Sequence, residues 1–206
     1  MTPRSLFRPF ALSPFRLFAL SLFCLFSCST RTPEDPIGSR GTFVPPTSPS
    51  IVIENFRAAV SEKNTENYML CLSDPTTRSR YVYAFEPSAE ARARFQSLFG
   101  TWSLLKERQS FVSMISRLSA DVRPTLTFIN SNFSFSSPDS SIFVTDYELV
   151  VDHGLTSIPT TLAGTMVLAI TPEPSGLWSI SRWTDAKRPT DSVEVTWSLL
   201  KAQLTN

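Results

Sequence analysis

The chain has 206 residues, of which 42% are hydrophobic and 18% charged, and its formal net charge is +1. This near-neutral balance, without a run of basic residues, gives no electrostatic footprint for nucleic acid, so we exclude a nucleic-acid partner. The three cysteines and the single histidine are too few and too scattered for a zinc site of Cys and His ligands. We therefore predict no metal and no cofactor.

The amino-terminal end has the pattern of an export signal. Three arginines precede a ten-residue apolar run over residues 17–26, which is followed by Ser27 and Cys28. A basic head, an apolar stretch too short to span a membrane and a small residue at the cut site are typical of a cleaved signal peptide. The cysteine directly after the cut resembles the bacterial lipoprotein signal. That resemblance implies that residues 1–27 are removed and that Cys28 carries a lipid.

Two other interpretations of this end stay open. An ordinary secretory signal could be cut near the same place, which would leave Cys28 as an incidental thiol. An organelle transit peptide is also Arg-rich and acid-poor, but such peptides are amphipathic and lack so uniform an apolar block. The lipoprotein interpretation predicts a domain outside the cytoplasm, in the bacterial cell envelope, held to a membrane by the lipid on Cys28.

The signal carries three arginines and no acid, so the mature chain would have 16 basic and 18 acidic residues. This balance argues against a polybasic segment as a second membrane signal.

Composition divides the rest of the chain into two parts. Residues 28–49 are rich in Pro, Ser and Thr and have few residues that could form a core, so we expect an extended tether. Residues 50–206 have the size of one domain. Once Cys28 is lipidated, Cys71 has no partner for a disulfide within the chain, and its apolar helical surroundings predict a buried small hydrophobe.

Helical patterns fill the first half of the domain. Apolar residues recur at three- and four-residue steps, and we expect helices over residues 50–64, 65–73, 88–99 and 102–118. Gly100 should close the third in a left-handed conformation. The predicted buried side chains are Ile53, Phe56, Ala59, Val60, Tyr68, Leu70 or Cys71, Leu72, Leu105, Phe111, Met114, Ile115 and Leu118.

Strand patterns follow a short alternating segment at residues 81–85. From Pro124 onward the apolar period is two, which predicts strands over residues 125–135, 142–152, 160–171 and 177–185 in an antiparallel meander. Phenylalanines change parity within the first strand, which predicts a bulge around residues 130–132. Gly164 in the third strand suggests a bend where something packs closely.

The order of these elements resembles the nuclear transport factor 2-like superfamily. The opening segment IVIENFRAAVSEKNTENYMLCLSD is similar to the family's first helix pair, and GLWSISRWTD is similar to its closing strand. The resemblance implies an α+β, cystatin-like and cone-shaped fold, in which a bent antiparallel sheet of four long strands packs on amino-terminal helices. These are packing motifs, so they indicate fold far better than function.

Proton transfer is the activity that the resemblance suggests first. Glu86 lies near the family position at which ketosteroid isomerase keeps its carboxylate base, so it is a weak catalytic candidate. Phe56 stands where that enzyme has an acid tyrosine, so the expected oxyanion donor is missing. Asp152 and His153 are adjacent, like the residue types of the family's dehydratases, but neighbours on a strand point to opposite faces. We expect them to form a solvent-exposed turn, and Asp146 and Glu148 to form a solvated rim.

Aromatic residues are the better candidates for a pocket, although a cluster of this kind is more often simply core. The candidates are Tyr68, Phe85, Trp102, Phe128, Phe133, Tyr147, Trp178 and Trp183. If some of them line a cavity, an apolar small molecule is the natural ligand. We therefore expect a small-molecule-binding or protein-interaction module that could dimerise through its sheet, with a small isomerase or dehydratase as the alternative.

The tail from Asp191 is expected to dock as a core helix, with partner binding as the second interpretation.

Overall fold

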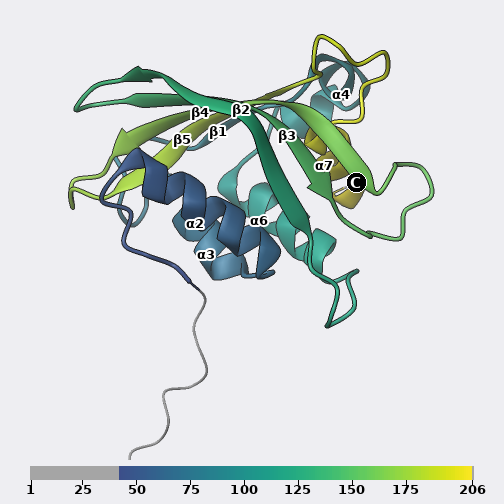
Figure 1. Cartoon of the computed structure of the whole chain (residues 1–206), viewed down its shortest axis with the longest axis horizontal. Helices are drawn as coiled ribbons and strands as arrows, with labels where there is room; N and C mark the ends of the chain where they lie inside the picture. The colour runs from purple at the N-terminus through teal and green to yellow at the C-terminus, as the bar shows by residue number, and fades with distance from the viewer. Residues whose placement is uncertain (1–41, 206) are drawn as a thin grey trace, which may run out of the picture. The chain divides into compact units, whose positions relative to one another are not determined.

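The computed structural model describes residues 42–205, which build a five-stranded sheet with helices packed on one face (Figure 1). Residues 1–41, with the predicted signal, Cys28 and most of the tether, lie outside the described residues. The elements in chain order are α2 (Pro49–Ser61), α3 (Thr65–Leu70), β1 (Ala84–Glu86), α4 (Ala89–Arg94), α5 (Gln96–Phe99), α6 (Leu104–Ile115), β2 (Thr125–Ser136), β3 (Ser141–Val150), β4 (Thr161–Pro172), β5 (Trp178–Ala186) and α7 (Trp197–Thr205). Within residues 42–205, no helix has the length and apolar character needed to cross a membrane.

Local signals explain where the main helices begin. Pro49 occupies the first turn of α2, where its missing N–H costs nothing. Asn64 caps α3 by accepting a hydrogen bond from the Asn67 N–H, and Ser103 caps α6 in the same way. The predicted apolar faces of the first two helices are confirmed, because Phe56, Val60, Tyr68, Cys71 and Leu72 are all buried.

The sheet has the strand order β1-β5-β4-β3-β2. The four long strands form the predicted antiparallel meander, which confirms the α+β class. A fifth strand corrects the expected four: β1 covers Ala84–Glu86, so it begins three residues later than the short strand predicted at residues 81–85, and it pairs parallel with β5. β1 joins the far edge of the sheet because its one inward side chain, Phe85, lies opposite Trp183 and completes the core there.

The bend in β2 lies where the phenylalanines change parity. Pairing with β3 slips between Ile129 and Asn132, and Asn130 has a positive φ of 53°, so the predicted bulge is confirmed. Gly164 also marks a close approach. A Cβ there would come within 2.9 Å of the Tyr147 ring and 2.7 Å of the Ala186 carbonyl oxygen. β4 nevertheless pairs without interruption through Gly164, and its own register shift comes later, between Ala169 and Ile170.

Three local predictions are wrong. Gly100 is right-handed, with φ of −63°, because the chain continues in a helical turn and needs no left-handed stop. Helix 88–99 is divided into α4 and α5 at Phe95, whose backbone leaves the helical region. Leu105 is 64% exposed, whereas Glu107 is buried. Residues two apart lie on different sides of a helix, so the burial of Glu107 turns Leu105 outward.

Strand alternation gives the sheet two distinct faces. The inner face packs on α2 and α7 and carries Tyr147, Leu168 and Trp183, all fully buried. The outer face carries alternate residues that are only partly covered. By register, this outer-face set comprises Glu86, Ile129, Ile142, Val144, Asp146, Glu148, Val167, Ala169, Arg182 and Thr184.

Candidate functional site

A buried carboxylate lies at the centre of the helical layer. Glu107 on α6 is fully buried, and three side chains donate hydrogen bonds to it: Tyr68 at 2.6 Å, Tyr83 at 3.1 Å and Trp102 at 2.8 Å. Burial is the main cause that raises the pKa of both tyrosines well above 10, and the Glu107 charge adds to it. Both phenols therefore remain neutral donors at neutral pH.

Lys201 on α7 brings a positive charge to this carboxylate. Its Nζ lies 2.7 Å from Glu107 Oε1, and both side chains are 1% exposed. The ammonium and the carboxylate therefore form a buried charge pair. Aromatic rings cover its other sides, with the ring centres of Trp183 at 3.5 Å and Phe85 at 3.7 Å. Burial lowers the Lys201 pKa to about 8, although Glu107 opposes the shift. We call Lys201, Glu107 and their contacts the interior cluster.

A second buried carboxylate anchors the start of α7. Asp185 Oδ2 accepts hydrogen bonds from the Ser198 N–H at 2.8 Å and from its hydroxyl at 2.5 Å. Its Oδ1 accepts from the Tyr147 hydroxyl at 2.9 Å, and that hydroxyl in turn accepts from the Trp197 N–H at 2.7 Å. Burial raises the Asp185 pKa to about 6, against the opposing effect of these donors. The polar atoms of this group therefore form hydrogen bonds that hold α7 on the sheet.

Glu86 lies away from both carboxylates. It is on the outer face, where it forms an ion pair with Arg182 and accepts a hydrogen bond from the Thr184 hydroxyl at 3.1 Å. Strand alternation explains this placement, because Phe85 takes the inward position of β1 and leaves its neighbour outside. Glu86 therefore contacts neither the interior cluster nor the Asp185 group.

The aromatic candidates are mostly packed inside. Tyr68, Tyr147 and Trp183 are fully buried, and Trp102, Phe128 and Trp178 are partly buried against the core. Phe133 is 40% exposed on the bent end of β2. Phe85 is the candidate that also borders an open space, as described below.

Asp152 and His153 lie after the end of β3 at Val150, outside any strand, and the expected exposed turn is wrong for the histidine. His153 is fully buried while Asp152 is exposed. The imidazole Nδ1 accepts from the Leu155 N–H at 3.0 Å, and Nε2 lies 3.1 Å from the Pro159 carbonyl oxygen. The ring can be buried because both of its nitrogens make polar contacts with backbone atoms of the loop between β3 and β4.

An open groove lies between β1 and the helices α4 and α5. Its volume is about 760 Å³, within the range of small-molecule sites. Its lining is Phe85, Pro87, Ala89, Arg92, Ala93, Gln96, Phe99 and Gly100. The Phe85 ring separates this groove from the buried Lys201 ammonium, so the groove ends where the interior cluster begins.

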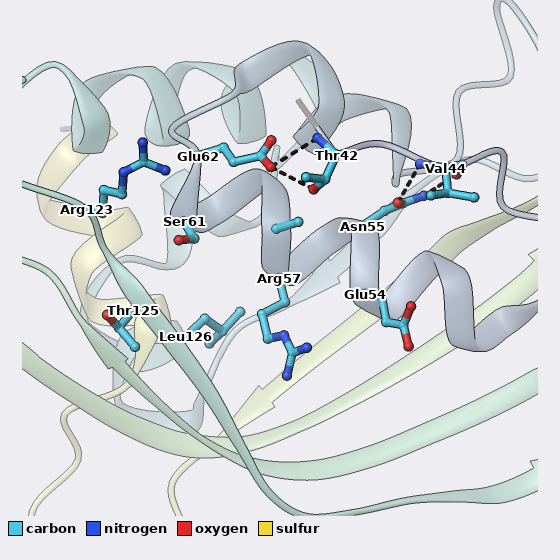
Figure 2. A pocket seen from close by; sticks show the side chains of 11 residues that line it. Thr42, Val44, Glu54, Asn55, Arg57, Ser61, Glu62, Arg123, Thr125 and Leu126 are labelled. Atoms are coloured by element: carbon cyan, nitrogen blue, oxygen red, sulfur yellow. Dashed lines mark hydrogen bonds between the residues drawn. The ribbon is translucent and has the colours of Figure 1, made fainter. Parts of the chain in front are cut away.

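A second cavity, which we call the α2–β2 pocket, has a volume of about 530 Å³. It lies beside α2, near the first described residues and the start of β2 (Figure 2). Its charged lining residues are Glu54, Arg57, Glu62 and Arg123. Within residues 42–205, no three His, Cys, Asp or Glu side chains gather as a metal site requires.

Sequence reasoning missed the charged residues of the interior cluster, although a signal existed. Glu107 precedes the buried Phe111 by four residues and the buried Met114 by seven, which places a carboxylate on the apolar face of α6. Lys201 likewise follows the buried Trp197 by four residues on α7. A charged residue at a core position of a helix indicates a buried partner elsewhere in the fold.

No protein-family model and no curated protein matches the chain. Among solved structures, a protein named for aromatic ring hydroxylation, from Novosphingobium aromaticivorans, is similar with 10% identity and a TM-score of 0.48, over 68% of this chain and 85% of that one. A protein named for a calcium/calmodulin-dependent protein kinase II association domain, from Xanthomonas campestris, is similar with 12% identity and a TM-score of 0.47. The match covers 69% of this chain and 86% of that one. A ketosteroid isomerase-like protein from Erwinia carotovora atroseptica is similar with 10% identity and a TM-score of 0.44. The match covers 68% of this chain and 92% of that one. Similarities this weak say nothing about activity, so the function has to be argued from the geometry of this chain's own residues.

Proposed function

We propose that the protein is a lipid-anchored, exported domain of the nuclear transport factor 2-like type, which acts as a small-molecule-binding or protein-interaction module in the bacterial envelope. The order of elements supports the domain type, because a helix pair, a short strand, further helices and four antiparallel strands follow one another as the resemblance implies. The Ser27-Cys28 junction after the apolar run supports the lipid anchor.

The filled interior is the observation that favours a module over an enzyme. The Lys201 ammonium occupies the space between the sheet and α6, and the three donors around Glu107 are already committed. A proton-transfer site needs a carboxylate within hydrogen-bond reach of a substrate. Glu107 is sealed from solvent, and Glu86 is paired on the outer face, so neither is placed to serve as that base.

Turnover assays test the enzyme alternative. We expect no activity of the purified protein toward small steroid, polyketide-like or hydroxy-acid substrates. Activity in wild type that disappears in Glu86→Gln would promote the enzyme interpretation, since losing a general base costs on the order of a hundredfold or more in rate.

The groove beside Phe85 is the place where the module would hold an apolar small molecule. Phe85 and Phe99 give it aromatic walls, and Arg92 adds one charge at the lining. Native mass spectrometry after gentle purification should find a retained ligand. Ala93→Trp should fill the groove and abolish retention, while Arg94→Trp, which places the same indole at a neighbouring position outside the groove lining, should not. Equal retention in both variants would exclude the groove.

The outer face of the sheet is where we propose that two copies associate. Val144 and Val167 are paired across β3 and β4 at its centre, and both are partly exposed. A charge at such a centre would be buried without a partner, so Val144→Glu should shift sedimentation from dimer to monomer. Identical sedimentation of Val144→Glu and wild type as dimers would place the association elsewhere.

A further inference from the structure

The groove beside Phe85 combines buried apolar residues with an exposed helical wall. Phe85, Pro87 and Phe99 are the buried part of its lining, and the ring centres of the two phenylalanines lie 5.9 Å apart. Their side chains offer no hydrogen bonds, so this part of the groove favours the apolar body of a ligand.

The exposed part of the lining comes from α4 and the start of α5. Ala89, Arg92 and Ala93 share one face of α4, because Arg92 and Ala93 follow Ala89 by three and four residues, and Gln96 begins α5. The two alanines leave space beside the aromatic rings. Arg92 is the one charged residue among the eight that line the groove, so the groove has a single positive charge and no acid.

The fold does not pair Arg92, in contrast to its neighbour Arg94. Arg94 forms an ion pair with Glu90 at 3.1 Å, on a side of α4 that does not line the groove. Within residues 42–205, Arg92 takes part in no ion pair. A guanidinium can bind a carboxylate through two parallel hydrogen bonds, and the Gln96 amide can donate one more. The charge in the groove is therefore available to an acid.

Lys201 is the other cation near this groove, but the fold already uses it. Its Nζ lies behind the Phe85 ring, 3.7 Å from the ring centre, and it is paired with Glu107 at 2.7 Å. A negatively charged ligand in the groove would therefore meet Arg92 and not Lys201.

We propose that the groove beside Phe85 binds an amphipathic carboxylic acid of the fatty-acid type. The carboxylate would lie on Arg92 and Gln96, and the apolar chain would lie over Phe85 and Phe99. This inference rests on the proposed function of the groove as a small-molecule site, and it adds the charge and the chemical class of the ligand. The volume of about 760 Å³ is in the range of sites for ligands of this size.

Calorimetric titration with three ligands of equal chain length tests this assignment. Residues 42–205 enclose their own core, so a chain of residues 29–206, without the predicted signal and lipid, can be used. The ligands are dodecanoate, dodecanol and dodecylammonium, each below the concentration at which it forms micelles. Dodecanoate should bind about tenfold or more tightly than the other two, because it alone gains charge-assisted hydrogen bonds from Arg92.

Variants then separate recognition of the acid from binding in the groove. Arg92→Gln should weaken dodecanoate binding by about tenfold or more and leave dodecanol unchanged. Arg94→Gln, which removes an arginine next to the groove but outside its lining, should leave both affinities unchanged. Ala93→Trp should abolish the binding of both ligands. Circular dichroism checks that each variant is folded.

Two kinds of failure can be told apart. Equal affinity of wild type for dodecanoate and dodecanol, or the same dodecanoate affinity in Arg92→Gln as in wild type, would overturn the acid specificity and keep the groove as an apolar site. No binding of any of the three ligands would overturn this inference, while a different ligand retained in native mass spectrometry and lost in Ala93→Trp would still support the proposed function.

Discussion

The interior cluster places a full ion pair where a domain of this size usually places apolar side chains. Glu107 receives three hydrogen bonds and one ammonium, so its charge is well compensated. Lys201 has one carboxylate and two close aromatic faces. Such pairs add little net stability, but removal of one partner leaves an uncompensated buried charge.

This asymmetry gives a testable prediction for Lys201. Lys201→Met should lower the free energy of unfolding by about 3–5 kcal/mol, because Glu107 would lose its counter-charge. The double variant Lys201→Met with Glu107→Gln should recover at least half of that loss, since the amide oxygen can still accept hydrogen bonds. Urea denaturation measures both. A double variant no more stable than Lys201→Met alone would show that packing, and not charge, sets the cost.

Asp185 should make the stability depend on pH in an unusual direction. Its folded pKa of about 6 lies above its ordinary value of 3.8, so the folded state binds the proton more tightly than the unfolded state. The stability that this group contributes is complete below pH 3.8 and is lost as pH rises through about 6. Between pH 7 and pH 4, the Asp185 contribution should therefore grow by about 2 kcal/mol.

Urea denaturation at several pH values, in wild type and in Asp185→Asn, isolates this contribution. The asparagine keeps an acceptor for Ser198 but cannot titrate, so the stability difference between the two proteins should change across pH 4–7. Parallel pH profiles would mean that Asp185 titrates normally in the fold.

Among the elements, β4 shows how one missing side chain shapes its neighbours. The Tyr147 ring occupies the space above Gly164, which lets its hydroxyl reach Asp185. Gly164→Ala should cost about 1–3 kcal/mol, because a Cβ would press on the ring and on the Ala186 carbonyl oxygen. Val167→Ala, on the outer side of the same strand, is the control. A smaller loss in Gly164→Ala than in Val167→Ala, measured by chemical denaturation, would mean that the ring has room to move.

The elements themselves could largely be predicted from the sequence, because their patterns are local. Alternation alone located β3 and β4, and the parity change between Phe128 and Phe133 located the bulge in β2. Burial of charged and polar side chains could not be predicted in the same way. Glu107 is buried because Lys201 arrives from the last helix, and His153 because a loop backbone surrounds it. Those partners depend on the tertiary fold, and so does the charge of the α2–β2 pocket, whose residues come from separate segments.

For the whole molecule, lipidation at Cys28 is the prediction that decides where the domain works. Labelled palmitate should enter the wild-type chain, and Cys28→Ser should abolish the label, because the lipid is attached through that sulfur. Cys71→Ser is the matched control and should keep the label, since the Cys71 thiol is buried in the domain. Equal labelling of wild type and Cys28→Ser would refute the lipoprotein interpretation and leave an ordinary secretory signal.

The position of α7 after all the other described elements has a consequence for biosynthesis. Trp197, Leu200 and Lys201 lie in the core, yet a ribosome adds them after every other helix and strand of the described domain. Until then, a nascent chain lacks the counter-charge of Glu107 and the ligands of Asp185. We therefore expect the described domain to stay open until α7 has been synthesised, and an open chain is the state that passage through a translocation channel requires.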